Sequence, residues 1–127
     1  MRRSLLPLGL MLALAACQPA SPPNATAPAA PTDFIYAELD IADLQARMQA
    51  GELDSRRLTQ AYLDRIAAVD KAGPQLNAVI ELNPDALKEA ALRDVERRAN
   101  AVRGPLHGIP VLLKDNLDAV PMATSAG

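Results

Sequence analysis

Hydrophobic residues recur at helical spacing in the stretch that follows residue 40. Ile41, Leu44 and Met48 are three and four positions apart, with Asp40 before them and Gly51 after them. Aspartate favours the N-cap of a helix, and glycine favours its C-terminal end. The pattern therefore predicts an amphipathic helix between Asp40 and Gly51, with one face packed on another element.

A second periodic stretch begins after Asp54 or Ser55, either of which can cap a helix. Its apolar stripe consists of Leu58, Tyr62, Ile66 and Val69. The sequence Lys-Ala-Gly-Pro at 71–74 ends the pattern, because glycine and proline do not continue a helix. We expect a second helix that buries this stripe in the core.

A third helix is predicted between two short apolar runs. Residues 77–82 and 109–113 are short, apolar and partly β-branched, which favours strands. Asn83 and Pro84 supply a cap and a proline for the first turn of a helix over 85–100. The apolar positions of this helix are Leu87, Ala91, Val95, Ala99 and Val102. The charged positions, expected in solvent, are Lys88, Glu89, Arg93, Asp94, Glu96, Arg97 and Arg98.

The order helix, helix, strand, helix, strand predicts an α/β fold with parallel strands. A parallel sheet is buried on both faces. Three helices that are apolar on one side only do not bury both faces of a two-stranded sheet. Much of the apolar content is alanine, which contributes little buried area. We therefore expect residues 38–127 to be the N-terminal part of a larger domain, whose mixed sheet is incomplete in this chain.

The first 17 residues have the pattern of a bacterial lipoprotein signal peptide. Two arginines precede the apolar stretch LLPLGLMLALAA at 5–16, which is too short to span a bilayer. Leu14-Ala15-Ala16-Cys17 resembles a lipobox, so Cys17 is the expected lipidation site; the alternative is an ordinary secretory signal with an incidental cysteine. Residues 18–37 follow as a Pro- and Ala-rich linker. We expect a protein of the bacterial periplasm or cell envelope, attached to the membrane through Cys17.

Composition excludes several other functions. The formal net charge is −2 and the sequence pI is about 5.3, which does not suit nucleic-acid binding. Cys17 is the only cysteine, so no intramolecular disulfide or multi-cysteine metal site is possible. We expect neither a cofactor nor a metal. The sequence does not determine an oligomeric state.

Residues 103–116, RGPLHGIPVLLKDN, resemble the signature of the amidase signature family. The resemblance extends over about 38–127, although the larger part of the family domain has no counterpart here. Members of this family hydrolyse amide bonds, or transfer the released ammonia, with a serine nucleophile, a second serine in a cis peptide and a lysine. The motif match implies that Lys114 is this lysine.

A lysine at the end of a buried strand loses hydration, which favours the neutral amine and lets it accept a proton from a serine. We therefore expect Lys114 to be a buried base. His107, the only histidine, is expected in a packing or turn role, and Asp115 is expected to bind backbone groups behind the site. Ser125 matches neither family serine. The resemblance thus places both serines outside this chain and predicts no hydrolysis by the chain alone.

Two other functions remain open on these residues. One is an amidotransferase A-type subunit of the same family, although a signal peptide does not suit that cytoplasmic work. The other is a non-catalytic lipoprotein remnant that binds a partner. The amide substrate is not determined by these residues.

Overall fold

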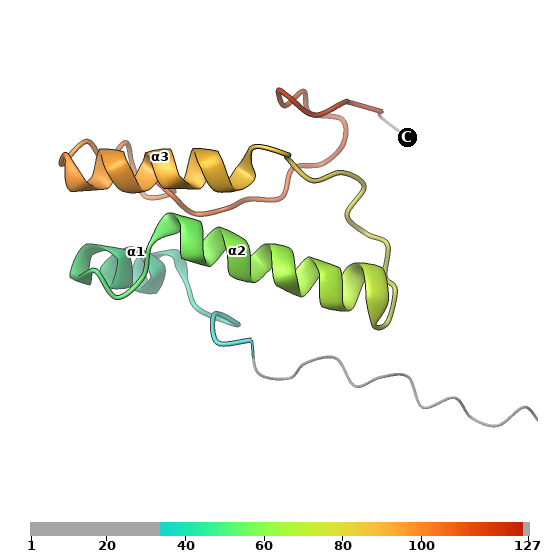
Figure 1. Ribbon diagram of the computed structural model, residues 1–127, viewed down its shortest axis with the longest axis horizontal. Coiled ribbons are helices and arrows are strands. Elements are labelled where there is room, and N and C mark those ends of the chain that lie inside the picture. The colour runs from blue at the N-terminus through green and yellow to red at the C-terminus, as the bar shows by residue number, and fades with distance from the viewer. Residues whose placement is uncertain (1–33, 126–127) are drawn as a thin grey trace, which may run out of the picture.

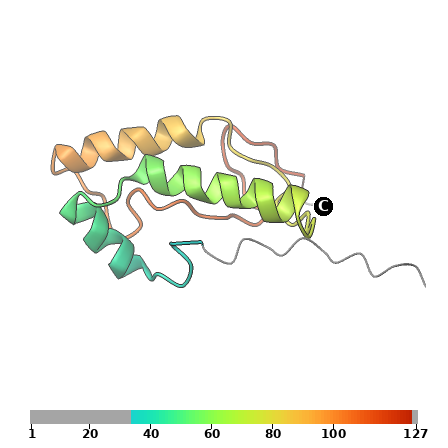
Figure 2. The ribbon, with the colours of Figure 1, turned by 60° about the horizontal axis from the view of Figure 1, so that its bottom comes forward.

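The computed structural model describes residues 34–125, and its regular structure is helical. The elements are α1 (Ile41–Ala50), α2 (Ser55–Arg65), the π-helical segment η1 (Ile66–Ala72) and α3 (Ala86–Arg98). Figure 1 shows α2 and α3 side by side and antiparallel, with η1 continuing α2. In Figure 2, α1 lies at an angle to both, next to the N-terminal end of α2.

The first two predicted helices are confirmed, together with their caps. Asp40 Oδ1 accepts a hydrogen bond from the backbone N–H of Asp43 at 2.8 Å, as an N-cap does. Gly51 ends α1 with a φ of 75°, a conformation that glycine adopts without strain. At the start of α2, Asp54 accepts from the N–H of Arg57 at 2.6 Å.

The core lies between α1, α2 and the chain that precedes them. Its buried apolar side chains are Tyr36, Leu44, Met48, Leu53 and Leu58. Phe34 packs against this cluster and makes edge-to-face contacts with Tyr36 and Tyr62. The folded part therefore includes Phe34 and Tyr36, which the sequence analysis placed in the linker.

The strands predicted at 77–82 and 109–113 are absent from the part of the chain that the structure describes. Both segments lack regular structure, and no backbone ladder joins them. The physical reason is that a strand exists only through pairing, and residues 34–125 offer these segments no neighbouring edge. The described residues are thus helical, and the predicted α/β sheet is not formed within them.

The predicted solvent and core faces of α3 also require correction. The helix packs against α2 with Ala90 and Asp94 buried, whereas Val95 and Val102 are exposed. Leu87 and Ala91 are half-buried, as expected for residues next to that face. The apolar stripe predicted along α3 therefore faces partly away from the core, and a carboxylate occupies the contact with α2.

Candidate active site

Lys114 ends a segment that runs from a turn at 105–108 back along α2 and α3, as Figure 1 shows in salmon. Its side chain is exposed, and its carbonyl accepts a hydrogen bond from the N–H of Leu117 at 2.9 Å. The prediction of a buried lysine on a strand is therefore wrong for residues 34–125 taken alone. No part of this described region covers the side chain or pairs with the segment that carries it. Cys17 lies outside the described residues.

The turn before this segment is fixed by a glycine. Gly108 has a φ of 80°, and a Cβ at that position would lie 2.0 Å from Ser55 Oγ. Only glycine allows both this backbone conformation and such close contact with the start of α2. Ile109 then packs against the core cluster, five residues before Lys114. The segment therefore begins at a position fixed by tertiary contacts.

His107 is buried in this turn and bonds backbone groups through both ring nitrogens. Nε2 lies 2.9 Å from the carbonyl oxygen of Arg93, which can only accept, so Nε2 carries the proton. In that tautomer Nδ1 accepts from the N–H of Arg103 at 3.4 Å. The imidazole thus joins the loop to α3, which supports a structural role for His107.

Arg97 and Gln45 hold the same turn from two helices. Arg97 Nη2 donates to the carbonyl oxygen of His107 at 3.0 Å and to Gln45 Oε1 at 2.7 Å. Gln45 Nε2 donates in turn to the carbonyl oxygen of Pro105 at 2.8 Å. The prediction that Arg97 lies on a solvated face is therefore wrong. The guanidinium of Arg97 shares the carbonyl oxygen of His107 with Gln45 Nε2, which donates to it at 3.1 Å, so two helices bind the same group of the turn.

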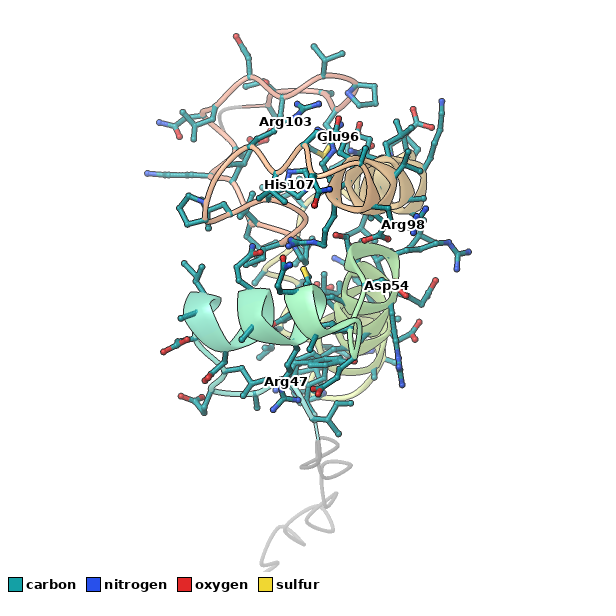
Figure 3. All side chains as sticks on the ribbon, turned by 90° about the vertical axis from the view of Figure 1, so that its left-hand side faces the viewer. Arg47, Asp54, Glu96, Arg98, Arg103 and His107 are labelled. Carbon is teal, nitrogen blue, oxygen red and sulfur yellow. The ribbon has the colours of Figure 1, made fainter. Side chains whose placement is uncertain are left out.

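Glu96 provides the negative charge in this region. It pairs with Arg93 at 3.0 Å and with Arg103, and it lies 3.8 Å from Nδ1 of His107. Figure 3 shows Glu96, Arg103 and His107 together between α3 and the loop that follows it. Arg98, also labelled there, is exposed, as the sequence analysis expected.

Asp94 is the residue at this junction that sequence reasoning missed. Its carboxylate accepts hydrogen bonds from the N–H groups of Ser55 at 2.6 Å and Arg56 at 3.1 Å. The signal that could have found it is the spacing of Leu87, Ala90 and Asp94, which places all three on one side of a helix. An acidic residue one turn after Ala90, on the side of the helix that packs against another element, indicates that its carboxylate accepts a hydrogen bond from a buried group.

The loop after Lys114 is closed by Asp115. The Asp115 carboxylate accepts from the backbone N–H of Ser125 at 3.3 Å and from its hydroxyl group. Glu81 Oε2 accepts from the N–H of Ala123 at 3.1 Å, which ties this loop to residues 76–82. Asp115 therefore binds a backbone group, the kind of contact that the sequence analysis expected of it.

Residues 34–125 contain neither a metal-binding cluster nor a membrane-spanning helix. No group of three or more histidine, cysteine, aspartate or glutamate side chains there is placed to hold a metal ion. Within the same residues, no helix is long and apolar enough to cross a membrane.

Comparison with known proteins identifies the family. The family model described as Amidase matches residues 57–127, more than half of the chain. A second model, for the prokaryotic membrane lipoprotein lipid attachment site, matches residues 1–18. The chain therefore belongs to the amidase family, as the block at 103–116 predicted.

Relatives in this family include enzymes of different names. The chain is 42% identical over 91 residues to the A-type subunit of glutamyl-tRNA(Gln) amidotransferase from Renibacterium salmoninarum, covering 71% of this chain and 17% of the relative. It is 38% identical over 77 residues to the indoleacetamide hydrolase of Bradyrhizobium diazoefficiens, covering 60% and 14%.

One protein of solved structure is more similar to this chain in sequence than these two relatives are. The peptide amidase of Stenotrophomonas maltophilia is 76% identical and superimposes with a TM-score of 0.73, covering 75% of this chain and 20% of that one. The chain thus spans about one-fifth or less of the relatives it matches. The backbone of the described residues corresponds to that of a solved amidase despite the absence of strands here.

Proposed function

We propose that this chain is the N-terminal part of an exported, lipid-anchored amidase in which Lys114 is the catalytic base. The observation that carries the proposal is the fourteen-residue block at 103–116, which ends on Lys114-Asp115-Asn116 inside the region matched to the family. The packing of His107 supports it, because the one histidine of the chain is engaged with backbone groups and its ring is not free to act as the base.

The proposed chemistry is hydrolysis of a carboxamide C–N bond by two serines and Lys114. Neutral Lys114 accepts the proton of the attacking serine through the hydroxyl of the second serine, while the nucleophilic oxygen bonds to the amide carbon. The C–N bond breaks, and the proton passes back through the same groups to the leaving amine. Water then hydrolyses the acyl-serine and releases the carboxylic acid.

For this step Lys114 has to be shielded from water. Residues 34–125 do not provide this shielding, because Lys114 is exposed among them. The proposal therefore assigns the cover of Lys114, and both serines, to the remainder of an amidase domain. The chain alone is expected to turn over no amide, because a base without a nucleophile has no serine to deprotonate.

We further propose a peptide amide as substrate and Cys17 as the site of the anchor. The 76% identity to a protein named as a peptide amidase supports the first proposal. The match of residues 1–18 to a lipoprotein attachment site supports the second, and with it a location in the bacterial cell envelope. The same match counts against an amidotransferase A-type role, which serves tRNA in the cytoplasm, despite 42% identity to a protein of that name.

The test is a chimera of the Stenotrophomonas peptide amidase in which the matched segment is replaced by that of this chain. We expect the chimera to release ammonia from a peptide amide. Lys114→Met should lower kcat/KM by about 100- to 10,000-fold, the usual contribution of a general base. Lys88→Met, at an exposed lysine on α3, is the matched control and should leave activity unchanged. An active Lys114→Met chimera would refute the catalytic role.

A further inference from the structure

A cleft between the start of α2 and the end of α3 collects positively charged side chains. It has a volume of about 410 Å³, and arginines from both helices line it, Arg56 and Arg57 from α2 and Arg98 from α3. Figure 3 shows Arg98 and Asp54 where α3 meets the start of α2, with Arg47 below them on α1. The formal net charge of the chain is −2, so a basic cleft is not a consequence of the overall composition.

The guanidinium groups of these three cleft arginines make no hydrogen bond or ion pair within residues 34–125. The neighbouring arginines differ in this respect. Arg93 and Arg103 both pair with Glu96, and Arg97 donates to the carbonyl oxygen of His107. The cleft therefore gathers cations that the described part of the chain leaves unpaired.

The two carboxylates that line the cleft bond to backbone groups and not to these arginines. Asp54 accepts from the N–H of Arg57 at 2.6 Å. Asp94 accepts from the N–H groups of Ser55 at 2.6 Å and Arg56 at 3.1 Å. The guanidinium groups are thus open to an anion from outside, and guanidinium binds phosphate well because its N–H donors match two phosphate oxygens at once.

Two arginines at the start of α2 are unfavourable for the helix itself. The N-terminal end of a helix carries a partial positive charge, so cations in the first turn destabilise it. Arg56 and Arg57 directly follow Ser55, the first residue of α2, and the first turn contains no acidic residue. Their charges therefore do not stabilise α2, which indicates that they act on a group outside the helix.

We propose that this cleft binds the phosphate group of an anionic phospholipid at the surface of the membrane. The choice of partner rests on the proposed function, in which Cys17 anchors the chain to that membrane. Residues 18–33 separate Cys17 from Phe34, which packs against the core, and a segment of this length spans at most about 55 Å. The anchor therefore keeps the cleft close to the headgroups, where anionic lipids attract basic side chains. Binding would orient the pair of helices toward the membrane.

The test measures sedimentation of the full chain with vesicles of phosphatidylcholine alone and with vesicles of phosphatidylcholine and phosphatidylglycerol in equal parts. All proteins compared carry Cys17→Ser, so none has the proposed anchor, and all share residues 1–33, which contribute equally. We expect the chain to bind the anionic vesicles more tightly than the neutral ones. Added salt should weaken this preference, because it screens exposed charges.

Arg56→Gln, Arg57→Gln and Arg98→Gln should each lower the partition coefficient for anionic vesicles by about fivefold, the usual contribution of one basic residue near an anionic surface. Arg47→Gln removes the same charge from an exposed position on α1 outside the cleft, so this control should change the coefficient little. The melting temperatures of Arg56→Gln and Arg57→Gln should equal or exceed that of the wild type, since both changes remove a cation from the N-terminal turn of α2. Weaker binding by these variants is then not a loss of fold.

The other outcomes decide against the proposal. Equal sedimentation with neutral and anionic vesicles, or an equal loss with Arg47→Gln, would overturn it. Calorimetric titration with inorganic phosphate in the absence of vesicles tests a free anion as the ligand. Phosphate binding that Arg98→Gln abolishes, without a preference for anionic vesicles, would assign the cleft to a soluble phosphate instead. These measurements depend neither on the lipid at Cys17 nor on Lys114, so their failure is distinct from failure of the proposed function.

Discussion

The carboxylate of Asp94 on α3 accepts a hydrogen bond from the backbone N–H of Ser55 at the first position of α2, at 2.6 Å. The N-terminal N–H groups of a helix have no partner within the helix, and here a residue 39 positions later supplies one. Asp54 satisfies the N–H of Arg57 in the same turn. The two acids therefore fix both the start of α2 and its contact with α3.

Asp94→Asn should destabilise the chain by about 1–3 kcal/mol, because the amide accepts more weakly than the carboxylate and leaves a buried N–H group poorly paired. Urea denaturation followed by circular dichroism measures the change. The amides of Ser55 and Arg56 should also exchange faster with solvent than in the wild type. Glu89→Gln, at an exposed acid on the same helix, is the control and should change the free energy of unfolding little.

Gly108→Ala should destabilise the chain more than Gly104→Ala. At Gly108 the new methyl group would meet Ser55 Oγ at 2.0 Å, with φ at 80°, whereas at Gly104 nothing lies within 4 Å. Overpacking of this kind costs about 1–3 kcal/mol. Thermal melts of both variants provide the comparison, and equal melting temperatures would contradict the close contact with α2.

Acid should weaken the junction between η1 and residues 76–82 through Asp70. Burial raises the pKa of this carboxyl, but the Lys71 ammonium and the N–H groups of Ala78 and Val79 outweigh burial and hold the pKa below its ordinary value. A lowered pKa in the folded state means that the stabilisation is complete above the unfolded pKa of about 4 and is lost as the pH falls through the folded value.

The free energy of unfolding of the wild type should therefore decline below about pH 4. Asp70→Asn should lower stability at pH 7 and flatten this acid dependence. Lys71→Met, which removes the ammonium and keeps the backbone donors, should have a smaller effect of the same sign. A pH dependence of Asp70→Asn identical to that of the wild type would show that Asp70 does not contribute.

His107→Gln separates a structural role from a catalytic one. In the chimera described above, this variant should reduce kcat/KM by less than the roughly 100-fold minimum that loss of a general base costs. The shape of the pH–rate profile should not change. The melting temperature should fall, because glutamine does not reproduce both ring contacts with Arg93 and Arg103. A lost or altered limb of the pH–rate profile would instead identify His107 as a titrating group in the reaction.

Cys17→Ser tests the proposed membrane anchor. In a bacterial host that processes lipoproteins, the wild-type chain should incorporate a palmitate analogue and fractionate with membranes. The serine variant should lose the label and leave the membrane fraction, since a thiol is required for attachment. Equal labelling of the two proteins would show that the lipid is attached elsewhere or not at all.

The local features of this protein follow from the sequence alone. Asp40, Gly51 and Asp54 mark the ends of α1 and α2 because capping depends on a few neighbouring residues. The block at 103–116 identified the family because it matches as a continuous stretch. The same block singles out Lys114, whose catalytic role stays a prediction.

The features that depend on distant residues were decided only by the tertiary structure. Asp94 and Arg97 look like solvated charges on α3. In the structure, however, Asp94 accepts from the N–H of Ser55 on α2, and Arg97 donates to the carbonyl oxygen of His107 in the turn after α3. Residues 77–82 and 109–113 have the composition of strands but lack a paired edge within residues 34–125. A helix is stabilised by bonds within one segment, whereas a strand and a buried charge take their partners from elsewhere, so the sequence determined the helices and tertiary contacts decided the rest.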